Sequence, residues 1–61
     1  MFEWICMVEV KLRDTEDTKW SHYVVKAGTP EGVVKAVEHE VRSDYATEPF
    51  TVIYLDMLRG D

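Results

Sequence analysis

The residue types that most often carry chemistry are few in this sequence and lie far apart. There is one cysteine, Cys6, and there are two histidines, His22 and His39. Zinc sites in proteins use such ligands in closely spaced pairs, and the sequence contains no such pair. Neither Cys6 nor any serine lies in the glycine-rich turn that presents a catalytic nucleophile. We therefore expect His22 and His39 to be ordinary surface residues, and we expect no metal or cofactor.

Carboxylates are abundant, but their spacing matches no common ion site. Asp14, Glu16 and Asp17 lack the glycine and the closing glutamate of a calcium-binding loop. The segment AGTPEG holds two glycines without the lysine of a phosphate-binding loop. A chain of 61 residues also offers little room for an enclosed pocket. The sequence thus predicts a protein that is not an enzyme.

The balance of charge limits the kind of partner. The chain has 12 acidic and 7 basic residues, for a formal net charge of −5. This charge disfavours direct binding to nucleic acid, which requires Lys and Arg to displace counterions. It is compatible with binding to a basic protein surface, including one that normally holds nucleic acid. The simpler interpretation is that the charge keeps a small protein soluble, and both interpretations stay open here.

Length and cysteine content define the class of protein. Sixty-one residues predict a single domain, 1–61, with a small core and a thin margin of stability. Cys6 has no partner for a disulfide within the chain, so tight packing or association with another chain must add stability. A lone cysteine fits a reducing cytoplasm. We expect no signal peptide and no membrane partner, because no stretch reaches the roughly 20 apolar residues that span a bilayer.

The elements that must position these side chains follow from hydrophobic alternation and turn residues. Residues 2–13 and 20–27 are predicted strands, joined by the polar loop 14–19. Segment 28–45 contains a helix, which Thr29 caps and Pro30 begins, and residues 50–58 form a third strand. A right-handed crossover then gives an α+β fold of order β-β-α-β. The predicted sheet is antiparallel, of order 2-1-3, with the helix on one face.

Matching apolar positions predict the register of the first two strands and the buried face of the helix. One register aligns the apolar side of both strands, and a slip by one residue would destroy the match. The predicted strand pairs are Asp14–Lys19, Leu12–Ser21, Val10–Tyr23, Val8–Val25 and Cys6–Ala27. Cys6 is therefore predicted to be buried. On the helix, Val33, Val34, Val37 and Val41 form the apolar side, with Ala36 near its edge.

Apolar residues on the second face of the sheet are the best functional lead. The even positions of the first strand are apolar and face the helix, yet Ile5 and Met7 lie at odd positions. Val24 and Trp20 of the second strand share their face, and the third strand is apolar on both sides. A contiguous apolar patch on a small protein is typical of a binding surface. The alternatives are that the chain termini fold over this face, or that scattered apolar residues have no role.

One stretch resembles a known family. The run YVVKAGTPEGVVKAVEHEV, followed by PFTVIYL, is similar to the layout of small host RNA polymerase inhibitors made by lytic phages. Members of that family have a similar length, the same β-β-α-β order and a capped, acidic start to the helix. The resemblance implies binding in the DNA channel of the polymerase, through an acidic strip and basic residues of the last strand. This chain departs from the pattern, because it has Tyr54 and Asp56 where the basic pair is expected, with Arg59 nearby.

Two hypotheses for function follow. The first is a small acidic inhibitor from a phage or mobile element, which blocks a nucleic-acid-handling enzyme or another protein in the host cytoplasm. The second is a homodimeric structural or interaction module without inhibitory role. The candidate contact residues for a partner are Asp14, Glu16, Asp17, Trp20, Ile5, Met7, Val24, Glu38, Glu40, Asp44 and Glu48.

Overall fold

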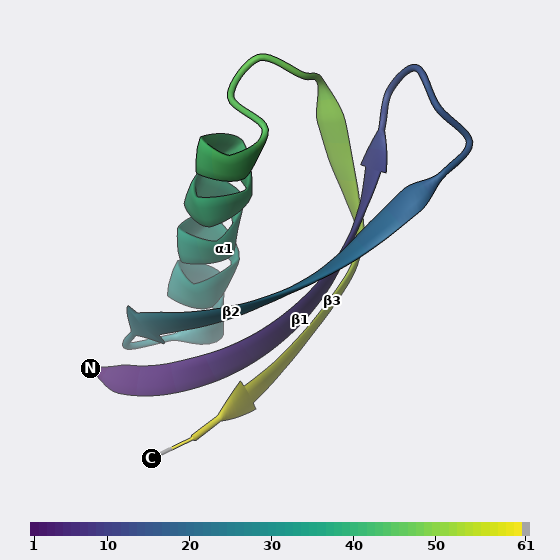
Figure 1. Cartoon of the computed structure of the whole chain (residues 1–61). Coiled ribbons are helices and arrows are strands. Elements are labelled where there is room, and N and C mark those ends of the chain that lie inside the picture. Colours follow the sequence, from purple (N-terminus) through teal and green to yellow (C-terminus); the bar gives the residue numbers. More distant parts are fainter. Residues whose placement is uncertain (61) are drawn as a thin grey trace.

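The computed structural model describes residues 1–60 and contains three strands and one helix (Figure 1). The predicted domain also includes Asp61, which lies outside the described residues. The elements are β1 (Phe2–Leu12), β2 (Thr18–Ala27), α1 (Pro30–Asp44) and β3 (Phe50–Arg59). Both β2 and β3 pair antiparallel with β1, so the sheet order is β2-β1-β3. The predicted α+β fold of order β-β-α-β is confirmed.

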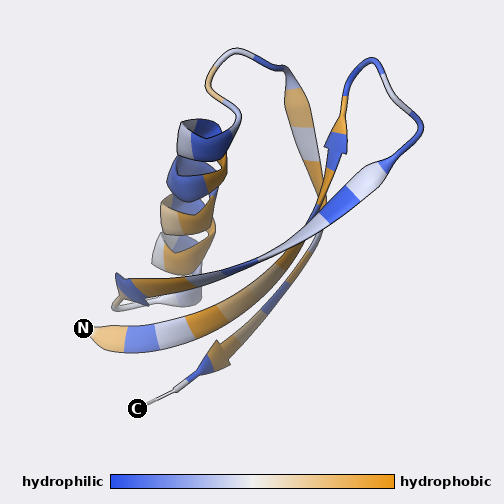
Figure 2. Cartoon of the chain, in the orientation of Figure 1, coloured by the Kyte–Doolittle hydropathy of each residue, from blue (hydrophilic) through white to orange (hydrophobic). Residues whose placement is uncertain are grey.

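The core lies between β1, β2 and α1. Alternate residues of β1 supply Cys6, Val8 and Val10, which are fully buried, and β2 supplies Val25 and Ala27. From the helix, the buried residues are Val33, Val37 and Val41. Figure 2 shows the hydrophobic residues of α1 on the side of the helix nearest the sheet. Valine is a poor helix former, so α1 depends on this packing for its stability.

The local signals at the start of α1 act as predicted. The Thr29 hydroxyl accepts a hydrogen bond of 3.2 Å from the Gly32 N–H, and Pro30 occupies the first turn, where no N–H is needed. At the other end, the Tyr45 N–H donates to the Val41 carbonyl at 2.9 Å. These contacts fix where the helix begins and ends, and hence where the chain turns towards β3.

The predicted register of β1 and β2 is wrong by four positions. Cys6 pairs with Tyr23, and Ala27 pairs with Phe2 instead of Cys6. The predicted register would leave the first residues of β1 beyond the end of β2, whereas the observed one forms ten pairs. The observed register requires a longer loop between the two strands, and a hydrogen bond from the Thr15 N–H to the Leu12 carbonyl holds this loop. Because the shift is an even number, the predicted faces are preserved.

A β-bulge in β3 explains why this strand is apolar on both sides. Glu9 pairs with Tyr54, but the next residue of β1, Val10, pairs with Val52, so Ile53 is the extra residue. The side that faces α1 therefore changes parity within the strand. Phe50, Val52, Leu55 and Met57 are half-buried on the helix side, and Thr51, Tyr54, Asp56 and Leu58 lie on the other side.

Candidate functional site

The face of the sheet that points away from α1, here called the open face, carries the largest exposed apolar residues of the strands. Its β1 residues are Glu3, Ile5, Met7, Glu9 and Lys11, which alternate with the buried ones. Of the predicted contact residues, four lie on this face and are substantially exposed: Ile5 by 47%, Met7 by 40%, Trp20 by 52% and Val24 by 63%. The position predicted for these four residues is therefore confirmed.

An apolar row crosses all three strands of the open face. Ile5 pairs with Val24 of β2 on one side and with Leu58 of β3 on the other. Leu58 is 67% exposed, more than any of its neighbours in the row. Met7 follows Ile5 on the same face of β1, between His22 and Asp56. Directly opposed residues on adjacent strands lie in side-chain contact range, so this apolar surface is continuous.

A second row contains two aromatic rings and a carboxylate. Glu9 pairs with Trp20 of β2 and with Tyr54 of β3. The rings of Trp20 and Tyr54 approach to 5.5 Å between centroids, with an interplanar angle of 59°. Glu9, on the strand between them, is half-buried, and its Oε2 accepts a 2.6 Å hydrogen bond from the Thr18 hydroxyl. The two aromatic side chains therefore converge above the strand that carries Glu9.

The negative charge of Asp56 affects the pKa of a buried residue on the other side of the sheet. Asp56 lies on the open face beside Met7, and its neighbour Met57 pairs with Cys6 on the helix side. Burial, and to a lesser extent the negative charge of Asp56, raises the pKa of the Cys6 thiol. The buried thiol therefore favours its protonated form, and Asp56 itself is exposed.

The structure places the acidic loop of the β1–β2 hairpin beside the loop that leads to β3. Asp14, Glu16 and Asp17 are all exposed in a largely hydrophilic segment (Figure 2). Glu48 comes close to them, because the Arg13 N–H donates to the Pro49 carbonyl at 3.1 Å. The two loops share a shallow pocket of about 190 Å³. Four of the predicted acidic contacts therefore gather at one end of the molecule (Figure 1).

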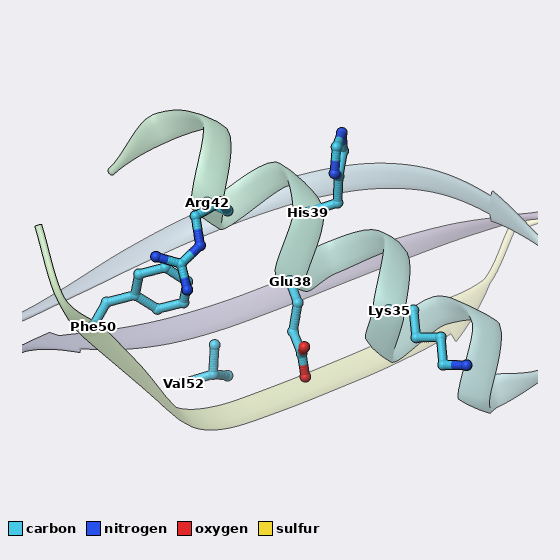
Figure 3. A pocket seen from close by; sticks show the side chains of 6 residues that line it. All are labelled: Lys35, Glu38, His39, Arg42, Phe50 and Val52. Atoms are coloured by element: carbon cyan, nitrogen blue, oxygen red, sulfur yellow. The ribbon is translucent and has the colours of Figure 1, made fainter. Parts of the chain in front are cut away.

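The other predicted acidic residues do not join this group. Asp44 accepts a 2.6 Å hydrogen bond from the Tyr23 hydroxyl, on the β2 side of the helix. Glu38 instead lines the opposite side of α1, where its carboxylate is directed toward β3 (Figure 3). Glu40 is exposed on the helix. The helix therefore distributes these three carboxylates over its circumference.

A groove between α1 and β3 has a volume of about 620 Å³. Its lining includes Lys35, Glu38, His39 and Arg42 of the helix, above Phe50 and Val52 of the strand. The Arg42 guanidinium lies 4.6 Å from the centre of the Phe50 ring and covers part of this apolar floor. Figure 3 shows the His39 ring directed away from Glu38. Charges of both signs line the groove, so it favours no single class of ligand.

The chemistry-bearing residues stay apart in the folded chain. Cys6 is buried on the helix side of the sheet, whereas His22 is exposed on the open face. Within residues 1–60, no group of three or more His, Cys, Asp or Glu side chains is arranged to hold a metal ion. Among the described residues, the open face therefore stands out through its exposed apolar side chains.

Sequence reasoning did not select several residues of the open face as contacts, namely Tyr54, Leu58, Glu9 and Asp56. The β3 residues were missed because β3 is apolar on both sides, so regular alternation does not show which side faces α1. A signal was present: Phe50 and Val52 are two apart, as are Leu55 and Met57, but three positions separate the pairs. That change of phase is typical of a bulge.

No helix in the described part of the chain is long and apolar enough to cross a membrane. Comparisons with models of protein families, with curated proteins and with solved structures found no significant match. The argument for function therefore depends on the residues of the open face and on the charge around it.

Proposed function

We propose that this protein is a small acidic binding module that uses the open face to cover a surface of another protein. The observation that carries the proposal is the continuous apolar row of Val24, Ile5 and Leu58, with Met7 beside it. An antiparallel sheet can leave one face in water, but that face is then normally polar. Exposed apolar patches of this kind mark interaction sites in small proteins.

The acidic charge supports a more specific form of this activity, in which the module blocks a basic surface of a nucleic-acid-handling enzyme. The net charge is −5, and Asp14, Glu16, Asp17 and Glu48 gather at one end of the molecule. Trp20 lies close to that end of β2 and is half exposed, so an aromatic anchor adjoins the acidic loops. The resemblance to phage inhibitors of RNA polymerase also supports a nucleic-acid-handling enzyme as the target.

A comparison of two lysine substitutions tests the proposal. Met7→Lys places a charge in the middle of the open face, and Ser43→Lys places the same charge on an exposed residue of α1 outside it. Affinity capture from a bacterial lysate, read by quantitative mass spectrometry, should recover the same protein with wild type and with Ser43→Lys. A buried, unpaired charge costs several kcal/mol, so Met7→Lys should reduce recovery by about tenfold or more.

Light scattering separates this function from the homodimeric alternative. A wild-type dimer that becomes a monomer in Met7→Lys, with nothing captured from the lysate, would assign the open face to self-association. Circular dichroism provides the control for folding, because Met7 is 40% exposed and a lysine there can reach water. If Met7→Lys changes neither capture nor the association state, the open face is not a binding surface.

A further inference from the structure

The row formed by Trp20, Glu9 and Tyr54 has the composition of a site for a cation. Trp20 and Tyr54 are 52% and 48% exposed, so both aromatic side chains are accessible to a ligand. A cation is attracted to the face of an aromatic ring, most strongly to that of Trp. Glu9 lies on the strand between the rings and supplies a negative charge beside them.

The Glu9 carboxylate is held in place by a hydrogen bond and has no cationic partner among the described residues. The Thr18 hydroxyl donates to Oε2 at 2.6 Å, and in residues 1–60 Glu9 makes no ion pair. Lys11, the next residue of β1 on this face, is half-buried and makes no ion pair with it either. A half-buried carboxylate without a counter-charge gains more from an incoming cation than a fully solvated one does.

A second carboxylate lies diagonally across the sheet. Glu9 pairs with Tyr54, and Asp56 is the next residue of β3 on the open face, opposite Met7. The Glu9 carboxylate is hydrogen-bonded to Thr18 of β2, which lies on the other diagonal, away from Asp56. Asp56 therefore adds negative charge near the row without being a second acceptor for the same ligand.

We propose that Trp20, Glu9 and Tyr54 form a binding site for an arginine side chain that the partner protein presents. This inference rests on the proposed function, because it takes the open face to be the contact surface. Arginine fits better than lysine for two reasons. Its flat guanidinium stacks on aromatic rings, and it offers a fork of N–H donors to a carboxylate. The net charge of −5 favours the approach of a basic partner.

A pair of small probes isolates the charge from the shape of the ligand. N-acetyl-arginine N-methylamide carries the guanidinium, and the citrulline analogue has nearly the same shape without the charge. Binding is read by NMR from the indole N–H of Trp20. The Trp4 indole is an internal control, because it donates to the Ala27 carbonyl at 3.0 Å on the other side of the sheet. Trp20→Phe removes one of the two indole signals and so assigns them.

The arginine probe should shift the Trp20 signal in a saturable manner and leave the Trp4 signal unchanged. The citrulline analogue should bind at least about fivefold more weakly, because hydrogen bonds between ionised groups are roughly twice as strong as neutral ones. The lysine analogue should also bind at least about fivefold more weakly, because its ammonium can neither stack flat on the rings nor offer a fork of donors to a carboxylate. Glu9→Gln keeps the size of the side chain and an acceptor for Thr18, and it should weaken binding by a similar factor. The matched control is Glu3→Gln, which removes an exposed carboxylate elsewhere on the open face of β1 and should leave binding unchanged.

Equal shifts with the arginine and citrulline probes, or an unchanged affinity in Glu9→Gln, would overturn the proposal. Equal binding of the lysine analogue would overturn the preference for guanidinium. If Glu9→Gln does not give a dispersed spectrum, Tyr54→Leu on the exposed edge strand β3 takes its place and should likewise weaken binding. Failure of this site leaves the effect of Met7→Lys on partner capture intact. Conversely, arginine binding with unchanged capture by Met7→Lys would refute the proposed function instead.

Discussion

The Tyr23 hydroxyl donates a 2.6 Å hydrogen bond to the Asp44 carboxylate, and this contact joins edge strand β2 to the last turn of α1. It lies at the border of the core, where Tyr23 is half-buried. Burial and the hydrogen bond to Asp44 raise the pKa of Tyr23 to about 12, from an ordinary value of 10.0. The contact should therefore make the stability of the protein depend on pH in the alkaline range.

The first prediction is an alkaline loss of stability that depends on Tyr23. Because the pKa is raised in the folded state, the folded protein favours the protonated phenol. That contribution is complete below pH 10 and is lost as the pH rises through about 12. Urea unfolding across this range should show a steeper decline in the wild type than in Tyr23→Phe. At neutral pH, Tyr23→Phe should lower the free energy of unfolding by about 1 kcal/mol. Tyr54→Phe, at an exposed tyrosine, is the control, and an equal effect of both substitutions would contradict the assignment.

The second prediction concerns the Cys6 thiol. It is fully buried and its pKa is raised, so both the access and the thiolate that a disulfide reagent needs are lacking in the folded state. Modification should therefore be slow in buffer and accelerate with urea in step with unfolding. Mass spectrometry at several times measures it. Rapid and complete modification in the absence of urea would show that the core opens around β1.

The third prediction is that the bulge residue can be removed. Deletion of Ile53 would bring Tyr54 next to Val52 and restore regular alternation, with Phe50, Val52, Leu55 and Met57 still facing α1. Deletion of Leu55 instead turns Asp56 to the side that faces α1 and Met57 to the opposite side. We expect the first variant to fold cooperatively and the second to lose most of its stability. Urea unfolding followed by circular dichroism compares them. An equally severe loss in both variants would mean that the bulge itself is needed for the twist of the sheet.

The fourth prediction concerns the acidic loops. If they guide the protein to a basic surface, reversal of Glu16 and Asp17 to Lys should slow association more than it speeds dissociation. The attraction is screened beyond about 8 Å at physiological salt, so the association rate should also fall as salt is added. Kinetics on the captured partner measure both effects. Reversal of Glu31 and Glu40 on the helix gives the same change in net charge away from the loops, and an equal slowing there would assign the effect to net charge alone.

Local patterns predicted the elements and faces of this fold, because each is encoded within a few residues. Thr29 and Pro30 determine where α1 starts, and alternation in β1 determines that Cys6 is buried and Ile5 is not. The register of the hairpin was not predictable in the same way. Two registers four residues apart bury the same faces, and the choice between them depends on how much of β1 finds a partner in β2.

The candidate site was also only partly predictable from the sequence, as the row of Trp20, Glu9 and Tyr54 shows. Trp20 was identified from its type and position, but Tyr54 and Glu9 became neighbours of it only through the register of two different strand pairs. The bulge at Ile53 also decides that Tyr54 faces outward. A site assembled across three strands depends on contacts between distant residues, which alternation along a single strand does not encode.

The sheet order has a consequence for how the molecule is made. β1 is the first strand in the sequence and the middle strand of the sheet, and Trp4 pairs with Arg59 of the last strand. During synthesis, the hairpin of β1 and β2 leaves the ribosome before β3 does. One edge of β1 therefore has no partner strand until β3 emerges. Contacts so distant in sequence slow folding relative to a helical protein of this size. During that interval a nascent chain exposes the edge of its most apolar strand, so we expect its yield to depend on chaperones that bind extended apolar segments.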